Sequence, residues 1–406
     1  MHANTKTSHL IKLSIILILG MLLNACAGES ESAETNDTGE SPSPDISIQE
    51  DVATGEDANS GQDAASENAS IASLEPGWNE ILPEGDTVCS RGSEFAYFVH
   101  NGTSNKLVLE FEGGGACWTD GTCSVADAIF DDSVEDERLL YQSGIVTGFL
   151  DHEHENHPFP DWHHIFIPYC TGDVHIGNSV HTYGEGDKAF TINHNGANNV
   201  RAVLDWAKDN IPAPEVIFMT GCSAGAYGSV LWVPHVAKQY PDAKIYQLGD
   251  SGCGVITQSF LDDSFPIWNG TEILPTWIES LHPDTFDVST ASLNDIYTNL
   301  AEHYSTQLFS QFTTIADNNQ TFYFEAMGGS GVEAWTDQML GSLDTISESS
   351  PNFRKYIAPG DKHCIIPYPE FYTLEVGGIK LVDWIINMTS GIPIEDVVCE
   401  ECTSSE

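Results

Sequence analysis

The stretch 216–229, VIFMTGCSAGAYGS, contains a serine in the setting that a nucleophile requires. The β-branched and apolar run 216–219 predicts a buried strand, and the run 226–238, rich in Ala, Val and Trp, predicts a helix. Between them stands G-x-S-x-G, in the strand–turn–helix order of a nucleophile elbow. We therefore expect Ser223 at the carboxyl end of a sheet, above a helix N-terminus that favours the negative charge of an attacked ester carbonyl. The alternative is a glycine-rich turn with an incidental serine.

A serine at such an elbow needs a general base and an acid to orient that base, and in this arrangement the chain order is Ser, acid, His. His363 is the candidate base, because among the histidines after Ser223 it alone follows a predicted strand and a Gly-Asp turn late in the chain. Asp317 directly follows the predicted strand 308–316 and lies between the two in sequence. Asp250, at the end of the preceding strand, is the alternative acid, and we favour Asp317.

A glycine-rich loop provides candidate oxyanion donors. The run 106–112, KLVLEFE, predicts a strong strand that leads into three consecutive glycines. Backbone N–H groups of such a loop can converge on one point, together with the amide that follows the nucleophile. The expected donors are Gly114, Gly115 and Ala224, whereas the alternative is a flexible loop.

Two further segments carry polar residues. The predicted strand 164–169 ends in T-G-D-V-H, which places Asp173 and His175 at the carboxyl edge of the sheet. We expect these two residues either to line the cleft or to belong to a structural turn. The segment 151–160, DHEHENHPFP, has the residue types of a metal site without spacing that would close a tetrahedron, so we favour a polar surface loop.

The N-terminus has the features of an export signal. Lys6 and Lys12 precede the apolar run 13–23, which is too short to cross a membrane as a mature helix and leads into Leu-Asn-Ala-Cys26. We expect residues 1–25 to be a lipoprotein-type signal peptide and Cys26 to carry the lipid, with a plain secretory cut as the alternative. The protein would then be an outer-membrane or cell-surface lipoprotein, anchored to the membrane and in some cases released.

Composition separates a linker from one large domain. Residues 26–76 are acidic and nearly free of large apolar side chains, which predicts a disordered tether. Residues 77–406 are long enough for a single domain. The net charge of −47, with 14 Lys and Arg against 61 Asp and Glu, excludes a nucleic-acid binder and is compatible with a salty environment.

Cysteine usage agrees with export. Nine cysteines follow Cys26, which predicts disulfides and one remaining thiol. Cys117 and Cys123 are close enough in sequence to form one bridge. The terminal Cys399 and Cys402 lack the context of a redox or metal motif, so a structural bridge is favoured.

The order of elements predicts an α/β fold. Predicted strands alternate with helices, such as the amphipathic run 197–210, which favours a mostly parallel central sheet flanked by helices, of the α/β-hydrolase type. Asn101-Gly102 predicts a hairpin turn between the two strands that flank it. The irregular segment 260–289, rich in Trp, Pro and Phe, is expected to be a cap over the site.

Several of these motifs together resemble the pectin acetylesterase/Notum family, in particular its bacterial secreted branch. They are GGGACW, PYCTGDVHIGN, GCSAGAYGS, the D-S-G after the next strand, TTIADNNQ and GDKHC. The resemblance extends from about residue 77 to the C-terminus and implies Ser223 as nucleophile, Asp317 as acid and His363 as base. It also implies the same oxyanion donors, and it places Trp118 against the substrate. The stretch after Asp317 lacks an aromatic residue associated with plant members, so their pectin contacts are not transferred.

The residues and the resemblance together predict a serine carboxylesterase that requires no metal or organic cofactor. Its expected substrates are small esters or O-acetyl groups of an extracellular polysaccharide. One alternative is a hydrolase of longer acyl chains or polyesters, favoured if the cap is mobile and apolar. The other is a catalytically silent lipoprotein that keeps the fold and binds at the surface.

Overall fold

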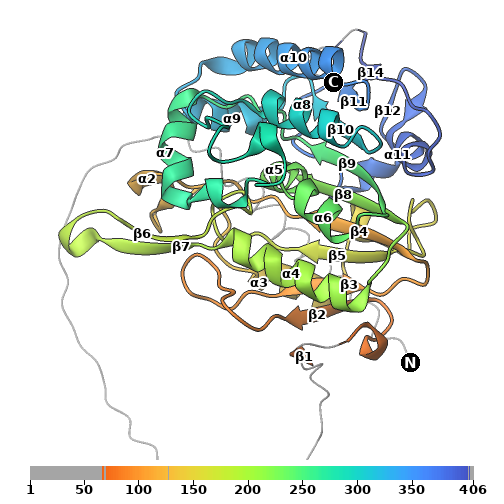
Figure 1. Cartoon of the computed structure of the whole chain (residues 1–406), viewed down its shortest axis with the longest axis horizontal. Coiled ribbons are helices and arrows are strands. Elements are labelled where there is room, and N and C mark those ends of the chain that lie inside the picture. Colours follow the sequence, from red (N-terminus) through yellow and green to blue (C-terminus); the bar gives the residue numbers. More distant parts are fainter. Residues whose placement is uncertain (1–65, 68–69, 127, 401, 403–406) are drawn as a thin grey trace, which may run out of the picture. The chain divides into compact units, whose positions relative to one another are not determined.

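A central sheet organises the described part of the chain, residues 66–67, 70–126, 128–400 and 402 of the computed structural model (Figure 1). Among these residues the strands follow the order β1-β2-β3-β5-β4-β8-β9-β10-β11-β14. Their bounds are β1 (Ser66–Glu67), β2 (Trp78–Leu82), β3 (Tyr97–His100), β4 (Lys106–Phe111), β5 (His163–Ile167), β8 (Val216–Cys222), β9 (Lys244–Asp250), β10 (Leu308–Thr314), β11 (Phe353–Ala358) and β14 (Val397–Val398). Neighbours are parallel except β2–β3 and β3–β5. The carboxyl ends of β4, β8, β9, β10 and β11 therefore share one edge, where sites form in open α/β sheets.

Both faces of the sheet are buried, and its central strands carry apolar side chains toward each of them. In β8, Ile217 and Met219 belong to the core cluster of one face and Phe218 to that of the other. The helices that supply the first cluster include α4 (Gly196–Asn210), α5 (Ala224–Leu231), α6 (Val233–Gln239), α8 (Leu293–His303) and α10 (Gly331–Ser349). The second face is covered by α11 (Leu381–Thr389) and by coil segments near residues 149–162 and 365–376. This is the expected α/β arrangement.

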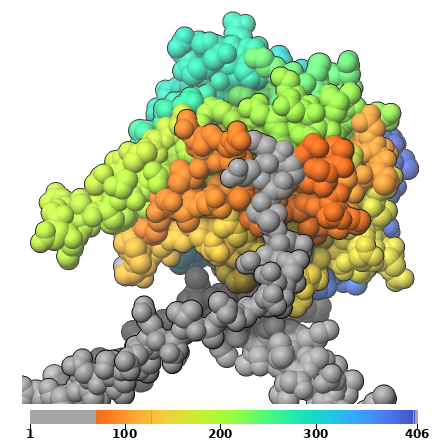
Figure 2. Space-filling view, turned by 90° about the horizontal axis from the view of Figure 1, so that it is seen from below, coloured from red at the N-terminus to blue at the C-terminus, as the bar shows by residue number. Residues whose placement is uncertain are grey.

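Shorter elements surround this framework. A hairpin of β6 (Ser179–Tyr183) and β7 (Phe190–His194) projects from the body and is visible at the left of Figures 1 and 2. The remaining helices are α2 (Asp120–Cys123), α3 (Glu135–Ser143), α7 (Gln258–Trp268) and α9 (Asn318–Ala326), and a small ladder joins β12 (Glu375–Val376) to β13 (Ile379–Lys380). The short 3₁₀ turns are Ile71–Ser73, Gly148–Leu150, Gly186–Lys188, Gly270–Ile273, Glu279–Leu281 and Pro369–Tyr372. No helix among the described residues is both long and apolar enough to span a bilayer.

Two local expectations are corrected. Asn101-Gly102 does not join a hairpin, because β5 lies between β3 and β4, antiparallel to the first and parallel to the second. The space beside Gly102 is taken by the backbone of Trp162, 2.2 Å from where a Cβ would stand. The helix expected over 226–238 is divided into α5 and α6 at Trp232, whose indole nitrogen donates to the carbonyl of His175.

The predicted signal peptide and Cys26 lie outside the described residues, as does most of the predicted tether. Its last part belongs to the domain instead. β1 pairs in parallel with β2, and the backbone N–H of Ile71 donates to the side chain of Asn210 on α4. The folded domain therefore begins about ten residues before the expected boundary at residue 77.

Disulfides join segments that are distant in sequence. The pairs are Cys89–Cys170, Cys117–Cys123, Cys222–Cys364 and Cys399–Cys402. This confirms the two predicted bridges, and Cys253 is the buried free thiol. The Cys222–Cys364 bridge, which the sequence did not reveal, encloses 142 positions of the chain and ends beside two candidate site residues.

Candidate active site

Ser223 occupies the sharp turn that its motif predicts. β8 ends at Cys222, α5 begins at Ala224, and Ser223 between them has φ 55° and ψ −119°. The turn packs so closely on β4 that a Cβ at Gly221 would lie 2.4 Å, and one at Gly225 1.9 Å, from the carbonyl oxygen of Phe111. Both glycines of the motif are therefore needed for close backbone approach.

Asp317 and His363 are paired beside this turn. Asp317 is fully buried at the N-cap of α9, where its carboxylate accepts the N–H groups of Asn319 and Gln320 and, at 2.9 Å, the side-chain amide of Gln320. The Nδ1 atom of His363 lies 2.9 Å from each carboxylate oxygen. Nδ1–H donation to the carboxylate leaves Nε2 as a proton acceptor. Within the described part of the chain this buried Nε2 has no hydrogen-bond partner, and His363 and Ser223 line one cavity.

Asp250, the alternative acid, has a different set of contacts. Its Oδ2 accepts the backbone N–H groups of Ile365 and Ile366, each at 2.8 Å, and its Oδ1 accepts the Ser251 hydroxyl. Burial raises the pKa of this carboxyl to about 6, against the lowering effect of those hydrogen bonds. Asp250 thus contacts the backbone that follows His363, whereas Asp317 contacts the imidazole itself.

The glycine-rich loop follows β4 and reaches the same place. Gly115 has φ 73° and lines the cavity together with Ser223 and Ala224. Ala224 is the first residue of α5, so its N–H has no acceptor within the helix. Gly114, at φ 141°, is packed against Asp131 and is not among the cavity-lining residues. The structure therefore brings two of the three expected oxyanion donors to the cavity wall.

The cavity itself has a volume of about 390 Å³ and largely apolar walls. The expected cap contributes much of the wall through Phe260, Leu261, Phe265, Trp268, Leu274, Phe286 and Val288. Other apolar side chains come from Tyr227 and Leu231 on α5 and from Leu293 and Ile296 on α8. Ser223 and His363 are polar groups at one part of this apolar wall, so the cavity can hold an apolar chain attached to a reacting carbonyl.

Asp173 and His175 are not among the residues that line the cavity. Asp173 is fully buried, and its carboxylate accepts Thr171 Oγ1, the N–H of His175 and the N–H of Gly196. His175 is also buried and bonds through Nε2 to the carbonyl of Glu112. These contacts fasten the turn after β5 to α4, so of the two expectations the structural turn fits their positions.

Trp118 is likewise held inside the protein. Its ring is 5% exposed and stands edge-on to Phe260, with the ring centroids 4.8 Å apart. Phe260 lines the cavity and Trp118 does not. Trp118 therefore lies behind the cavity wall. It supports α7 instead of lining the cavity where a contact with substrate was expected.

The histidine-rich segment 151–160 is partly exposed, as expected of a surface loop, but His157 within it is buried. His152 and His157 stack with ring centroids 4.2 Å apart, and Nε2 of His152 lies 3.0 Å from Nδ1 of His164. His164 in turn lies 2.9 Å from the carboxylate of Glu110, which is buried in β4. Sequence spacing alone gave no signal for this cluster, because it depends on the neighbouring strands β4 and β5.

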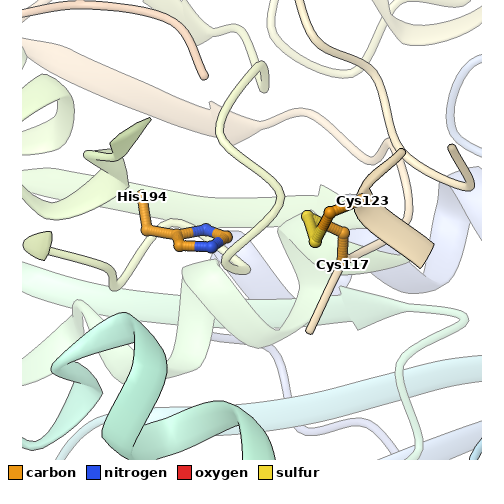
Figure 3. A group of neighbouring side chains, drawn as sticks. All are labelled: Cys117, Cys123 and His194. Atoms are coloured by element: carbon orange, nitrogen blue, oxygen red, sulfur yellow. A yellow bond between two sulfur atoms is a disulfide. The ribbon is translucent and has the colours of Figure 1, made fainter. Parts of the chain in front are cut away.

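Two groups of the described residues place His and Cys ligand atoms close enough for a single metal ion: Cys117, Cys123 and His194, and Cys222, His363 and Cys364. In both groups the two sulfur atoms are joined in a disulfide, as Figure 3 shows for the first. His194 uses both ring nitrogens, one with the hydroxyl of Tyr183 and one with the carbonyl of Thr171. In their present state neither group offers three free ligands.

The fold and the site define an α/β hydrolase with a nucleophile elbow, and comparison with solved structures agrees on the fold. The crystal structure described as the Wnt deacylase Notum from Drosophila aligns with a TM-score of 0.57 and 16% identity, over 79% of this chain and 95% of that one. At this identity the similarity concerns the fold.

Sequence comparisons agree with the fold over part of the chain. Residues 81–264 match the family model described as Pectinacetylesterase, so this segment is similar to the pectin acetylesterase/Notum family. Human palmitoleoyl-protein carboxylesterase NOTUM is 28% identical over 184 residues, which is 42% of this chain and 35% of that protein. Pectin acetylesterase 5 of Arabidopsis thaliana is 26% identical over 180 residues, 43% of this chain and 41% of that protein. The alignments thus span less than half of the curated relatives.

Proposed function

We propose that this protein is a serine carboxylesterase that acts through Ser223, His363 and Asp317. The observation that carries the proposal is the pairing of His363 Nδ1 with buried Asp317, while Nε2, which has no partner among the described residues, lies at the cavity that Ser223 lines. His363 takes the Ser223 proton as the hydroxyl oxygen attacks the ester carbonyl. The amides of Gly115 and Ala224 bind the oxyanion, the alcohol leaves with the proton from His363, and water then releases the acid by the same steps.

The cavity supports an acyl group longer than acetyl. Its volume of about 390 Å³ lies in the range of about 300–1,000 Å³ in which pockets enclose a drug-sized ligand. An acetyl group would leave most of such a cavity unfilled, whereas a longer chain would bury apolar surface at about 0.8 kcal/mol per CH₂. The alternative considered from sequence, hydrolysis of longer acyl esters, is therefore the substrate class we now favour.

Removal of O-acetyl groups from an extracellular polysaccharide is the second candidate. It is supported by the matched family model and by relatives described as pectin acetylesterases. Export also supports it, since disulfides form in oxidising compartments. In this proposal the lipid on Cys26 would keep the enzyme at the cell surface, close to such glycans.

Chain-length preference distinguishes the candidates. The test measures hydrolysis of p-nitrophenyl acetate, butyrate and octanoate by the domain from Ser66, beside Ser223→Ala and the matched surface control Ser305→Ala. We expect the highest kcat/KM on octanoate, and a loss of more than ~10³ in kcat for Ser223→Ala alone. A maximum on acetate would favour the deacetylase. If no ester is hydrolysed, or if Ser223→Ala stays active, the serine-esterase proposal fails and a silent binding protein becomes the better interpretation.

A further inference from the structure

A covalent bond joins the two chain segments that carry the proposed nucleophile and base. Cys222 immediately precedes Ser223, Cys364 immediately follows His363, and the two cysteines form a disulfide with Cα atoms 5.8 Å apart. We propose that this disulfide is a positioning cross-link, which keeps the His363 imidazole within reach of Ser223 during turnover. The inference rests on the proposed serine-esterase function. It adds Cys222 and Cys364 as positioning residues, whose disulfide is not changed by the reaction.

The backbone at this bridge is held in an uncommon conformation. Cys364 has φ 60°, and Ser251, which faces it, has φ 58°. Residues with a Cβ seldom adopt the left-handed region, and they keep it where the surrounding structure leaves no alternative. Here the N–H of Cys364 donates to the Ser251 hydroxyl at 2.9 Å. The turn after His363 is therefore fixed by several contacts, of which the disulfide is the covalent one.

Asp250 links the same two segments by hydrogen bonds. Its carbonyl oxygen accepts the N–H of Ser223 at 2.8 Å, and its carboxylate accepts the N–H groups of Ile365 and Ile366. It is also the register partner of Cys222 across β8 and β9. The segment 363–366, here called the base loop, is thus attached to β9 by Asp250 and to β8 by the disulfide.

The disulfide has a role that these hydrogen bonds do not replace. Asp317 reaches His363 from beyond the end of β10, and Asp250 reaches the following residues from the end of β9, whereas Ser223 directly follows β8. Only the Cys222–Cys364 bridge, among the described contacts of the base loop, ends on the residue adjacent to the nucleophile. A displacement of about 1 Å in a catalytic group can cost about 10² in rate. Removal of this link should therefore lower kcat while the cavity, and with it KM, changes little.

The test compares two double variants that each remove one long-range disulfide. Cys222→Ser/Cys364→Ser opens a loop of 142 positions, and Cys89→Ser/Cys170→Ser opens one of 81, at a place remote from both triad segments in sequence. Loop entropy depends only weakly on length, so both variants should lose similar thermal stability. At a temperature where circular dichroism shows both to be folded, we expect kcat on octanoate to fall about tenfold to hundredfold in the first variant, with KM within about twofold. The second variant should retain wild-type kcat.

A chemical experiment covers the case in which a variant does not fold. Wild-type protein is treated with a trialkylphosphine, which is oxidised to the phosphine oxide with oxygen from water while a disulfide takes up two electrons and two protons. Cys222 is partly exposed, whereas Cys89 and Cys170 are buried, so the Cys222–Cys364 bridge should be reduced first of these two. Thiol alkylation and mass spectrometry then show which bridge has opened. Loss of kcat should follow reduction of Cys222–Cys364, and oxidised glutathione, which releases two glutathione molecules, should restore it.

Each outcome decides one proposal. The positioning role would be overturned by equal kcat in the two double variants, or by full activity after Cys222–Cys364 is reduced. In either case hydrolysis by the wild-type protein would still support the esterase function. An inactive wild-type protein would instead remove the esterase function on which the inference rests.

Discussion

At the scale of single residues, two buried aspartates at the ends of adjacent strands have different partners. Asp317 bonds to the imidazole of His363, and Asp250 bonds to backbone N–H groups after it. Both positions were visible in the sequence as acids that follow strands, but the partners were not. Position along the chain favoured Asp317 over Asp250 as the candidate acid. Only the packing of the base loop against β9 shows that Asp250 bonds to the loop backbone, whereas Asp317 bonds to the imidazole.

Replacement of each acid should give different losses. Asp317→Asn offers an amide where His363 needs an acceptor, which disfavours the productive tautomer, so we expect kcat to fall by about 10⁴. Asp250→Asn keeps one oxygen acceptor for the loop and should cost at most about 10². The measurement is kcat on p-nitrophenyl esters for both variants, with thermal unfolding as a check of folding. A larger loss for Asp250→Asn would contradict the assignment.

At the scale of elements, we expect the segment after β9 to decide which acyl groups the proposed site accepts. It was predicted as a cap from its Trp, Pro and Phe content, and its apolar side chains indeed form much of the cavity wall. Its helix α7, by contrast, was not predicted, because Pro266 and the irregular composition obscure the helical period. The strands predicted at 106–112, 164–169, 216–219 and 308–316 and the helix predicted at 197–210 are present close to those bounds, whereas α8 and α10 were not predicted. The β6–β7 hairpin was missed because its strands alternate polar and apolar residues only weakly.

A larger side chain in the cap should shorten the preferred substrate. Val288 lines the cavity from a coil segment and is half-buried, so Val288→Trp can fill the cavity with little strain on the core. We expect kcat/KM on octanoate to fall about tenfold or more, with little change on acetate, since each methylene excluded is worth about 1–3 kcal/mol. Val125→Trp, at a position 79% exposed, is the control. Parallel losses on both esters would mean that the cavity does not hold the acyl chain.

At the scale of the whole molecule, charge and buried histidines set the conditions under which the fold is stable. Acidic residues outnumber basic ones by 61 to 14, so the folded chain repels itself electrostatically. Composition alone revealed this excess. The histidine cluster beside β5 could not be predicted in the same way, because the burial of His157 depends on Phe149 and Phe159 folding around it.

Acid should destabilise the protein through His157. Its Nε2–H donates to the carbonyl of Phe149 and its Nδ1 accepts the N–H of Phe159, and the second of these contacts requires the neutral ring. Burial lowers its pKa to about 4, below the ~6.5 of an exposed imidazole. The unfolded chain therefore binds more protons between these values, and stability falls as the pH falls from about 6.5 to about 4.

Urea unfolding at several pH values checks this effect. Over that interval the wild type should lose roughly 2–3 kcal/mol more than His157→Gln, which does not titrate there. Replacement of the exposed His303 by Gln should leave the pH dependence unchanged. Identical slopes for wild type and His157→Gln would show that this histidine does not limit acid stability.

Salt should stabilise the folded chain. Raising NaCl from about 0.1 M to about 1 M shortens the screening length from about 10 Å to about 3 Å, which weakens repulsion among the carboxylates. We expect the melting temperature to rise over this range, and to rise far less in sucrose of equal osmolarity. A salt response no larger than the sucrose response would contradict a role for net charge.

The Cys222–Cys364 bridge has one more consequence, which concerns cleavage of the chain. The whole cap, including its irregular stretch between α7 and α8, lies within the 142 positions that this bridge encloses. A protease that cut the exposed coil near Asp284 would therefore produce two fragments that stay covalently attached next to Ser223 and His363. Such a nicked protein should migrate as one band without reductant and as two with it. The cavity would be opened while the proposed nucleophile and base remain covalently linked through the disulfide.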